Sequence, residues 1–267
     1  MNDFGFHRPA SVAEAVRMLG AAADGRFVAG GQSLLGTMKL GLAAPSDLVD
    51  LSRIGGLSGI TVEPGVLRIG ATTTHAAVAA SADVRRLIPA LANLADLIGD
   101  PAVRARGTLG GSIANNDPAA CYPAGVLGLG ATIHTDRRAL AADDFFTDLY
   151  ETALAPGELV TAVSFPVPQQ AGWSKFRQPA SGFSLVGVFV SRGPAGVRVA
   201  VTGAAACVFR CAPLESALAA DFSPGACAGV RVAAPHLNTD LHASAEFRAH
   251  LIPVLAGRAV QQAGAGR

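Results

Sequence analysis

Hydrophobic residues along the first part of the chain alternate between the spacing of helices and that of strands. Ser11 followed by Glu14 has the pattern of a helix capping box, and apolar residues follow it at helical spacing. Short apolar runs at 26–29 and 47–51 predict strands, with a helix over 32–42 between them. The pattern therefore predicts a small α/β unit in which a glycine turn joins a strand to a helix.

The middle of the chain mixes the same two spacings. Strands are predicted at 66–70, 131–135 and 158–165. A helix is predicted from about His75, and another over 84–98 with a break or kink at Pro89. This part ends near the Pro-Val-Pro segment at 166–168.

The pattern changes after that segment. Strands are predicted at 173–177, 184–192 and 196–201, with a hairpin signal at 193–195 between the last two. Helices are predicted over 213–220 and 243–262, the second interrupted at Pro253. We therefore expect an α+β protein of three units, 1–55, 56–168 and 169–267.

Composition narrows the classes of function. Only 15% of the 267 residues are charged and the formal net charge is +1, which argues against nucleic acid and anionic membranes as partners. No apolar run is long enough for a membrane helix, and the N-terminus does not resemble a signal peptide. The four cysteines have neither zinc-site nor iron–sulfur spacing, so we expect reduced thiols in a cytoplasmic protein.

Two stretches combine glycine, hydroxyl and amide side chains with almost no charge. They are Ala29-Gly30-Gly31-Gln32-Ser33-Leu34-Leu35-Gly36 and Gly107-Thr108-Leu109-Gly110-Gly111-Ser112-Ile113-Ala114-Asn115-Asn116-Asp117-Pro118. Each is predicted to be a glycine turn that exposes backbone N–H groups, which bind anions without lysine or arginine. Either stretch alone is better explained by a simple chain reversal. Two stretches of the same character favour a ligand-binding interpretation.

Common nucleotide and hydrolase motifs are missing. Gly31-x4-Gly36-Thr37 resembles a phosphate loop but lacks its lysine, and neither stretch spells the dinucleotide fingerprint. The six histidines are scattered, with no nucleophile elbow near any of them. Asp143-Asp144 is typical of a helix start rather than of an acid/base pair. We therefore assign no catalytic residue and no metal ligand, a profile typical of proteins that hold a redox cofactor.

The two stretches resemble the two FAD diphosphate motifs of the molybdenum hydroxylases. The matching residues are Ala29-Gly30-Gly31-Gln32-Ser33 and Thr108-Leu109-Gly110-Gly111-Ser112. The chain is similar to the medium, FAD-binding subunits of carbon monoxide dehydrogenase type, and is related to the flavin domain of xanthine dehydrogenase. The resemblance implies the two-subdomain FAD-binding fold of the vanillyl-alcohol oxidase and carbon monoxide dehydrogenase flavoproteins, followed by a C-terminal α+β domain.

The resemblance also implies which residues hold FAD. They are Ala29, Gly30, Gly31, Gln32, Ser33, Thr108, Leu109, Gly110, Gly111, Ser112, Asp117 and Lys175. A cation at Lys175 would favour the anionic reduced flavin, with Arg177 as the competing candidate. Phe183 falls where an aromatic residue screens the isoalloxazine ring. Cys121 stands where several relatives carry an Asp that contacts FAD.

The implied function is electron transfer within a complex. A small [2Fe–2S] subunit and a large molybdopterin subunit would join this chain in a dimer of heterotrimers, and electrons would leave through FAD to an external acceptor. Any iron–sulfur cluster would then lie on another chain. Two alternatives stay open: a free-standing FAD-dependent oxidoreductase and a non-catalytic assembly or scaffold subunit. The sequence indicates neither the substrate of the complex nor the acceptor.

Overall fold

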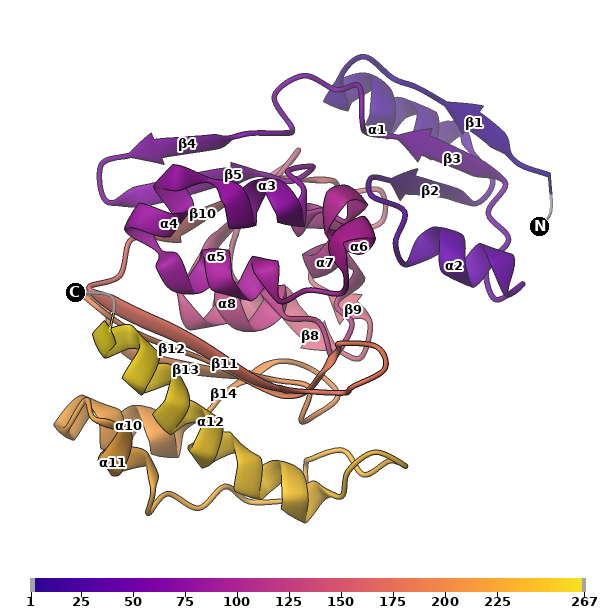
Figure 1. The fold of residues 1–267 in the computed structure, drawn as a ribbon. Helices are drawn as coiled ribbons and strands as arrows, with labels where there is room; N and C mark the ends of the chain where they lie inside the picture. The colour runs from indigo at the N-terminus through magenta and orange to yellow at the C-terminus, as the bar shows by residue number, and fades with distance from the viewer. Residues whose placement is uncertain (1–2, 266–267) are drawn as a thin grey trace.

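The computed structural model describes residues 3–265, and Figure 1 shows them as sheets and helices stacked from the N-terminal to the C-terminal part. The N-terminal part holds a three-stranded parallel sheet in the order β1-β3-β2. Its elements are β1 (Gly5–His7), α1 (Val12–Ala21), β2 (Gly25–Val28), α2 (Leu34–Lys39) and β3 (Asp47–Asp50). The expected cap at Ser11 is confirmed, since Ser11 Oγ accepts from Glu14 N. The reciprocal bond of the capping box is shifted by one residue, because Glu14 Oε2 accepts from the N–H of Ala10 instead of that of Ser11.

The middle part is a five-stranded antiparallel sheet in the order β4-β5-β10-β6-β7, with helices on one side. The strands are β4 (Ile60–Glu63), β5 (Val66–Gly70), β6 (Thr132–Thr135), β7 (Ala139–Ala141) and β10 (Val160–Pro166), and a separate ribbon pairs β8 (Phe146–Asp148) with β9 (Glu151–Thr152). The helices are α3 (His75–Ala80), α4 (Ala82–Leu87), α5 (Pro89–Asp96), α6 (Pro101–Arg106), α7 (Leu109–Asn115), α8 (Tyr122–Gly128) and α9 (Ala142–Phe145).

Two predictions for this part can be checked against its helices. The helix expected over 84–98 is divided into α4 and α5 at Ile88, whose φ of −139° is outside the helical range. Steric conflict with the ring of Pro89 disfavours helical geometry at Ile88, so the predicted break is confirmed. Asp143 and Asp144 lie in the first turn of α9, as expected of a helix start.

The last part is an antiparallel sheet in the order β11-β12-β13-β14, covered by helices. The elements are β11 (Gln170–Arg177), β12 (Ser184–Gly193), β13 (Gly196–Thr202), β14 (Phe209–Arg210), α10 (Ala212–Ala220), α11 (Pro224–Cys227) and α12 (Ala245–Ala265). The predicted hairpin is confirmed, with Gly193 paired to Gly196.

The prediction that Pro253 interrupts the last helix is wrong, because α12 is continuous through it. Ile252, Leu255 and Ala256 are completely buried where α12 packs on β11 and β12. This packing outweighs the single backbone hydrogen bond that a proline cannot donate. Within residues 3–265, no helix combines the length and the apolar character that crossing a bilayer requires.

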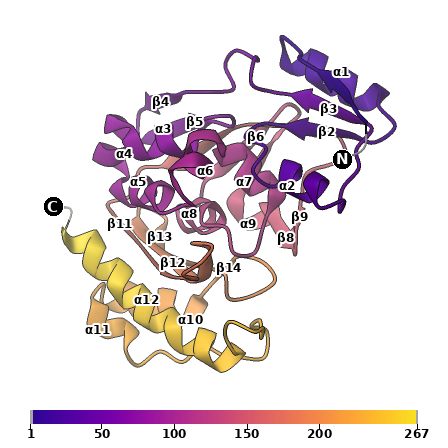
Figure 2. The same cartoon turned by 45° about the vertical axis from the view of Figure 1, so that its right-hand side comes forward.

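The last sheet is buried on both faces. Figure 2 shows it between α12 on one side and α5 and α8 on the other. Alternate residues of β12 point to opposite faces, so Val188 packs in the C-terminal core while Phe189 packs in the main core with Trp173. The main core therefore extends from the middle helices into the last sheet.

Candidate functional site

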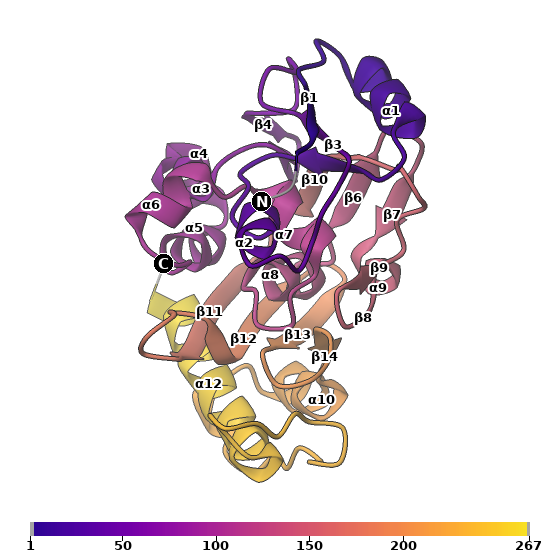
Figure 3. The ribbon, with the colours of Figure 1, turned by 90° about the vertical axis from the view of Figure 1, so that its right-hand side faces the viewer.

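A cavity of about 550 Å³ opens where three distant segments approach one another. Its walls come from the β2–α2 loop, from the start of α7, and from β11 with the following loop 178–183. In Figure 3, helix α2, which follows the first of these segments, lies beside α7. Cavities of this size are typical of sites for small molecules and cofactors.

Most of the residues that the sequence nominated lie in these walls. They are Ala29, Gly30, Gly31, Gln32, Ser33, Thr108, Gly110, Gly111, Ser112, Asp117 and Lys175. Leu109 is the exception: its side chain is completely buried in the main core, and its N–H donates to the carbonyl of Thr73. Phe183 and Cys121 also line the cavity, whereas Arg177 is not among the lining residues.

The β2–α2 loop offers the cavity a row of backbone donors. Among residues 3–265, no hydrogen-bond acceptor is found for the N–H groups of the four consecutive residues 30–33. Gly31 has a φ of +71°, a left-handed conformation that glycine adopts readily and that turns successive N–H groups toward one side. Since all four residues line the cavity, the loop forms a cradle for an anion without using a charged side chain.

The second glycine stretch differs from the expected turn, because it forms the start of helix α7. Thr108 is the N-cap, and its Oγ1 accepts from Gly111 N at 3.2 Å. Gly110 N donates to Ala71 O at 2.8 Å. The expectation that this stretch exposes its N–H groups is therefore wrong at Leu109, Gly110 and Gly111. What it presents to the cavity is the open surface of Gly111 and the side chains of Thr108 and Ser112.

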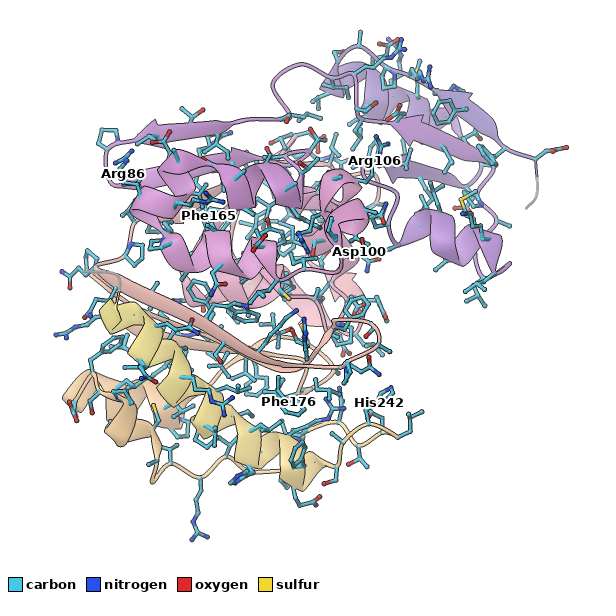
Figure 4. The ribbon with its side chains drawn as sticks, viewed as in Figure 1. Arg86, Asp100, Arg106, Phe165, Phe176 and His242 are labelled. Atoms are coloured by element: carbon cyan, nitrogen blue, oxygen red, sulfur yellow. The ribbon has the colours of Figure 1, made fainter. Side chains whose placement is uncertain are left out.

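The glycines of the two stretches allow close approach of the backbone. A Cβ on Gly30 would overlap the carbonyl of Arg106, at the end of α6 that faces the N-terminal sheet (Figure 4). A Cβ on Gly110 would come within 2.6 Å of Ala71 Cβ. A Cβ on Gly111 would meet only Thr108 Oγ1. Gly30 and Gly110 are thus required by packing within the protein, and Gly111 keeps the cavity wall open.

His75 is a cavity residue that sequence reasoning missed. It begins α3 after the N-cap Thr74, its N–H donates to Gly107 O at 2.9 Å, and its side chain is buried. Burial, with the positive charge of Arg104, lowers the pKa of His75 to about 4, so the imidazole is neutral at pH 7. His75 is brought to the cavity by its contact with the backbone of Gly107, which is 32 residues away in the sequence. No local sequence pattern predicts that contact.

Lys175 is held at the cavity wall by three acceptors. Its ammonium group lies 2.7 Å from Leu97 O, 2.7 Å from Gly182 O and 3.5 Å from Cys121 Sγ. Leu97 is the C-cap of α5, where carbonyl groups carry the negative end of the helix dipole. The cation is therefore fixed in position beside the lining residues Ile98 and Phe183.

The carboxylates of the lining are bound to neighbouring groups. Asp117 accepts from Ala119 N at 2.8 Å and from the hydroxyl of Tyr150 at 3.3 Å. Glu158 is buried and pairs with Arg138 at 2.8 Å. The hydrogen bonds from Arg138 lower the pKa of Glu158 to about 2, against the opposing effect of burial. Neither carboxylate is arranged as a general base, so the cavity is built to bind and orient a ligand.

Comparisons with known proteins point the same way. A family model described as the FAD binding domain in molybdopterin dehydrogenase matches residues 2–168. The chain is 35% identical over 271 residues to the nicotine 6-hydroxylase medium subunit of Paenarthrobacter nicotinovorans, covering 96% of each chain. It is 43% identical over 170 residues to the carbon monoxide dehydrogenase medium chain of Afipia carboxidovorans, covering 62% of this chain and 59% of that one.

A solved structure extends the likeness to the whole fold. The crystal structure of a Cu,Mo-CO dehydrogenase in its cyanide-inactivated form contains a chain that superposes with a TM-score of 0.88 at 32% identity. The superposition covers 100% of this chain and 99% of that one.

Proposed function

The chain belongs to the family of FAD-binding domains in molybdopterin dehydrogenases, and from this premise we propose that it carries electrons from iron–sulfur clusters on a partner chain through FAD to an external acceptor. FAD supplies the electron-transfer chemistry, and the protein binds, orients and tunes it. We place the assembly in the cytoplasm and divide the chain at residues 55 and 168 into two FAD-binding units and a C-terminal unit.

The observation that carries this proposal is the row of four N–H groups at residues 30–33, for which the described part of the chain offers no acceptor. A diphosphate is an anion with many acceptor oxygens, so a cradle of backbone donors fits it. Gly111, which has no side chain, and Ser112, which has a hydroxyl group, also line the cavity. Residues Ala29, Gln32 and Thr108 complete the proposed diphosphate site, and Leu109 supports it from the core.

The lining of the cavity suits the rings of a dinucleotide. Leu51, Leu154 and Val160 contribute apolar surface to it, and Lys175 contributes a positive charge. We assign the isoalloxazine ring to the part of the cavity beside Lys175. A cation there stabilises the negative charge that the flavin gains on reduction. His75, which also lines the cavity, is neutral at pH 7 and adds no positive charge of its own.

The lining of the cavity supports the proposal that the substrate reacts on a partner subunit and not on this chain. Among the described lining residues, Asp117 and Glu158 are held by hydrogen bonds and His75 is buried and neutral, so none of these three is placed to act as a general acid or base over a substrate. The similar proteins are named medium subunit and medium chain, which implies companions. We therefore propose a small [2Fe–2S] subunit and a large molybdopterin subunit as partners, in a dimer of heterotrimers.

The test is to purify the chain alone, and also after co-expression with the proposed small and large subunits. We expect a flavin absorption spectrum, release of FAD rather than FMN on chromatography, and co-purification of iron and molybdenum with the complex. A chain that takes up no FAD in either form would refute the cofactor assignment. A chain that holds FAD but purifies without partners, and oxidises a substrate by itself, would instead indicate a free-standing oxidoreductase.

A further inference from the structure

The three acceptors around the ammonium group of Lys175 are unequal. Two are backbone carbonyl groups at 2.7 Å, and the third is the thiol of Cys121 at 3.5 Å. An ammonium group has three N–H donors, and a thiol is a much weaker acceptor than a carbonyl oxygen. Two of the donors are thus held firmly, and the third is held weakly.

The two strong acceptors are fixed by their own surroundings. Leu97 ends helix α5. Gly182 lies in a turn closed by Gly182 N to Gln178 O and by Gln178 N to Phe183 O, both at 2.9 Å. Because both carbonyl groups belong to hydrogen-bonded backbone, the two short bonds to them set where the charge of Lys175 sits.

Cys121 faces both Lys175 and the cavity. Its side chain is only 5% exposed, it lines the cavity, and its Sγ also lies 3.5 Å from Ser184 Oγ. The third donor of Lys175 therefore points along the cavity wall toward a group that a better acceptor could replace. The oxygen and nitrogen atoms at the edge of an isoalloxazine ring are acceptors of that kind.

We propose that Cys121 is a positioning residue for Lys175: its thiol competes for the third N–H of the ammonium group, but so weakly that the flavin can take this donor over. This inference rests on the proposed function. If it holds, the strength of the hydrogen-bond acceptor at position 121 determines how strongly Lys175 stabilises reduced FAD relative to oxidised FAD. A stronger acceptor there keeps the donor for itself, and no acceptor releases it completely.

The test is the reduction potential of FAD bound to the full chain with alanine, cysteine or asparagine at position 121. We expect the reduction potential to be highest in Cys121→Ala, intermediate in the wild type and lowest in Cys121→Asn. Between the Ala and Asn variants, the affinity for reduced FAD relative to that for oxidised FAD should change about tenfold. For a two-electron couple this ratio corresponds to about 30 mV.

The same series in a Lys175→Met background separates positioning from packing. If Cys121 acts through Lys175, the difference between Ala and Asn disappears there. A difference that persists without the lysine, or potentials that are equal in its presence, would overturn the inference. Ser184→Ala, which alters the other neighbour of the thiol, is the control and should leave the potential unchanged.

Thermal unfolding shows whether each variant is folded. If the Asn variant loses FAD, the comparison of wild type with Cys121→Ala still decides the matter, because the potential must rise in the latter. Failure of the proposed function would look different, since wild-type protein would then hold no FAD at all.

Discussion

The two glycine stretches have nearly the same composition and opposite roles in the structure. Residues 30–33 leave their N–H groups without acceptors in the described part of the chain, so the loop is available to a ligand. In the stretch at 108–112, the N–H groups of Leu109 and Gly110 bond to the 71–73 segment, and Thr108 caps the helix. The first stretch can donate its N–H groups to a ligand, and the second uses its own to hold the cavity wall together. Composition identifies a glycine-rich site, but the hydrogen-bond partners decide what each glycine does.

The largest effect should come from the second stretch. Gly110→Val forces a side chain into Ala71, so we expect the free energy of unfolding to fall by about 3 kcal/mol. Gly36→Val is the matched control, because a Cβ at this helical glycine has no neighbour within 4 Å. Chemical denaturation measures both, and equal stability of the two variants would contradict the packing role of Gly110.

His75, whose N–H bonds to Gly107 at the start of the second stretch, should make the free energy of unfolding depend on pH. Its pKa is about 4 in the folded chain and 6.5 when exposed, so the unfolded state binds the proton more readily between these values. The free energy of unfolding should therefore drop as pH falls from 6.5 to 4, by up to about 1.4 kcal/mol per pH unit. It should be independent of this group above pH 6.5.

His75→Gln removes that titration, and urea unfolding at several pH values measures the change in slope. The assignment fails if the wild type and the His75→Gln variant lose stability with the same slope between pH 6.5 and 4.

Gly31→Ala tests the binding role of the first stretch. Alanine at a φ of +71° is strained by about 1–2 kcal/mol, and relief of that strain would turn the N–H groups away from the cavity. We expect FAD affinity to fall about tenfold, equivalent to about 1.4 kcal/mol. Gly41→Ala carries the same backbone strain at φ +72° outside the cavity lining. It should lower stability while leaving the affinity for FAD intact, and a matching loss of affinity would show that strain alone explains the effect.

The smallest effect should come from Thr108→Val, which removes the cap of α7. Loss of an N-cap costs about 1 kcal/mol of stability, and Thr108→Ser should restore it. Titration with FAD should then show only a minor change, because the proposed diphosphate donors lie mainly in the first stretch. Loss of FAD by the Val variant at unchanged stability would reverse the roles assigned to the two stretches.

Features set by neighbouring residues could be predicted from the sequence. The helix cap at Ser11, the break before Pro89 and the hairpin at Gly193 each depend on residues within a few positions of one another. Pro253 shows the limit of such reasoning, because burial of α12 against β11 and β12 overrides the local penalty.

The site divides in the same way. Its glycine, hydroxyl and amide residues are visible as a pattern, and all the nominated residues except Leu109 line one cavity. The role of each depends on contacts between distant segments, such as Gly110 with Ala71 or His75 with Gly107. The resemblance to the flavoprotein subunits nominated Lys175, but the three acceptors that hold it come from other segments of the chain.

Because the last sheet is buried on both faces, the protein cannot be divided at residue 168 into two stable fragments. The family match ends at residue 168, yet Trp173 and Phe189 from beyond that point are completely buried in the main core. A fragment that stops at 168 would expose a large apolar wall to water, and such surfaces drive aggregation. The last hundred residues are thus the other half of a shared interior, and limited proteolysis between the parts should yield precipitate instead of a stable flavin-binding core.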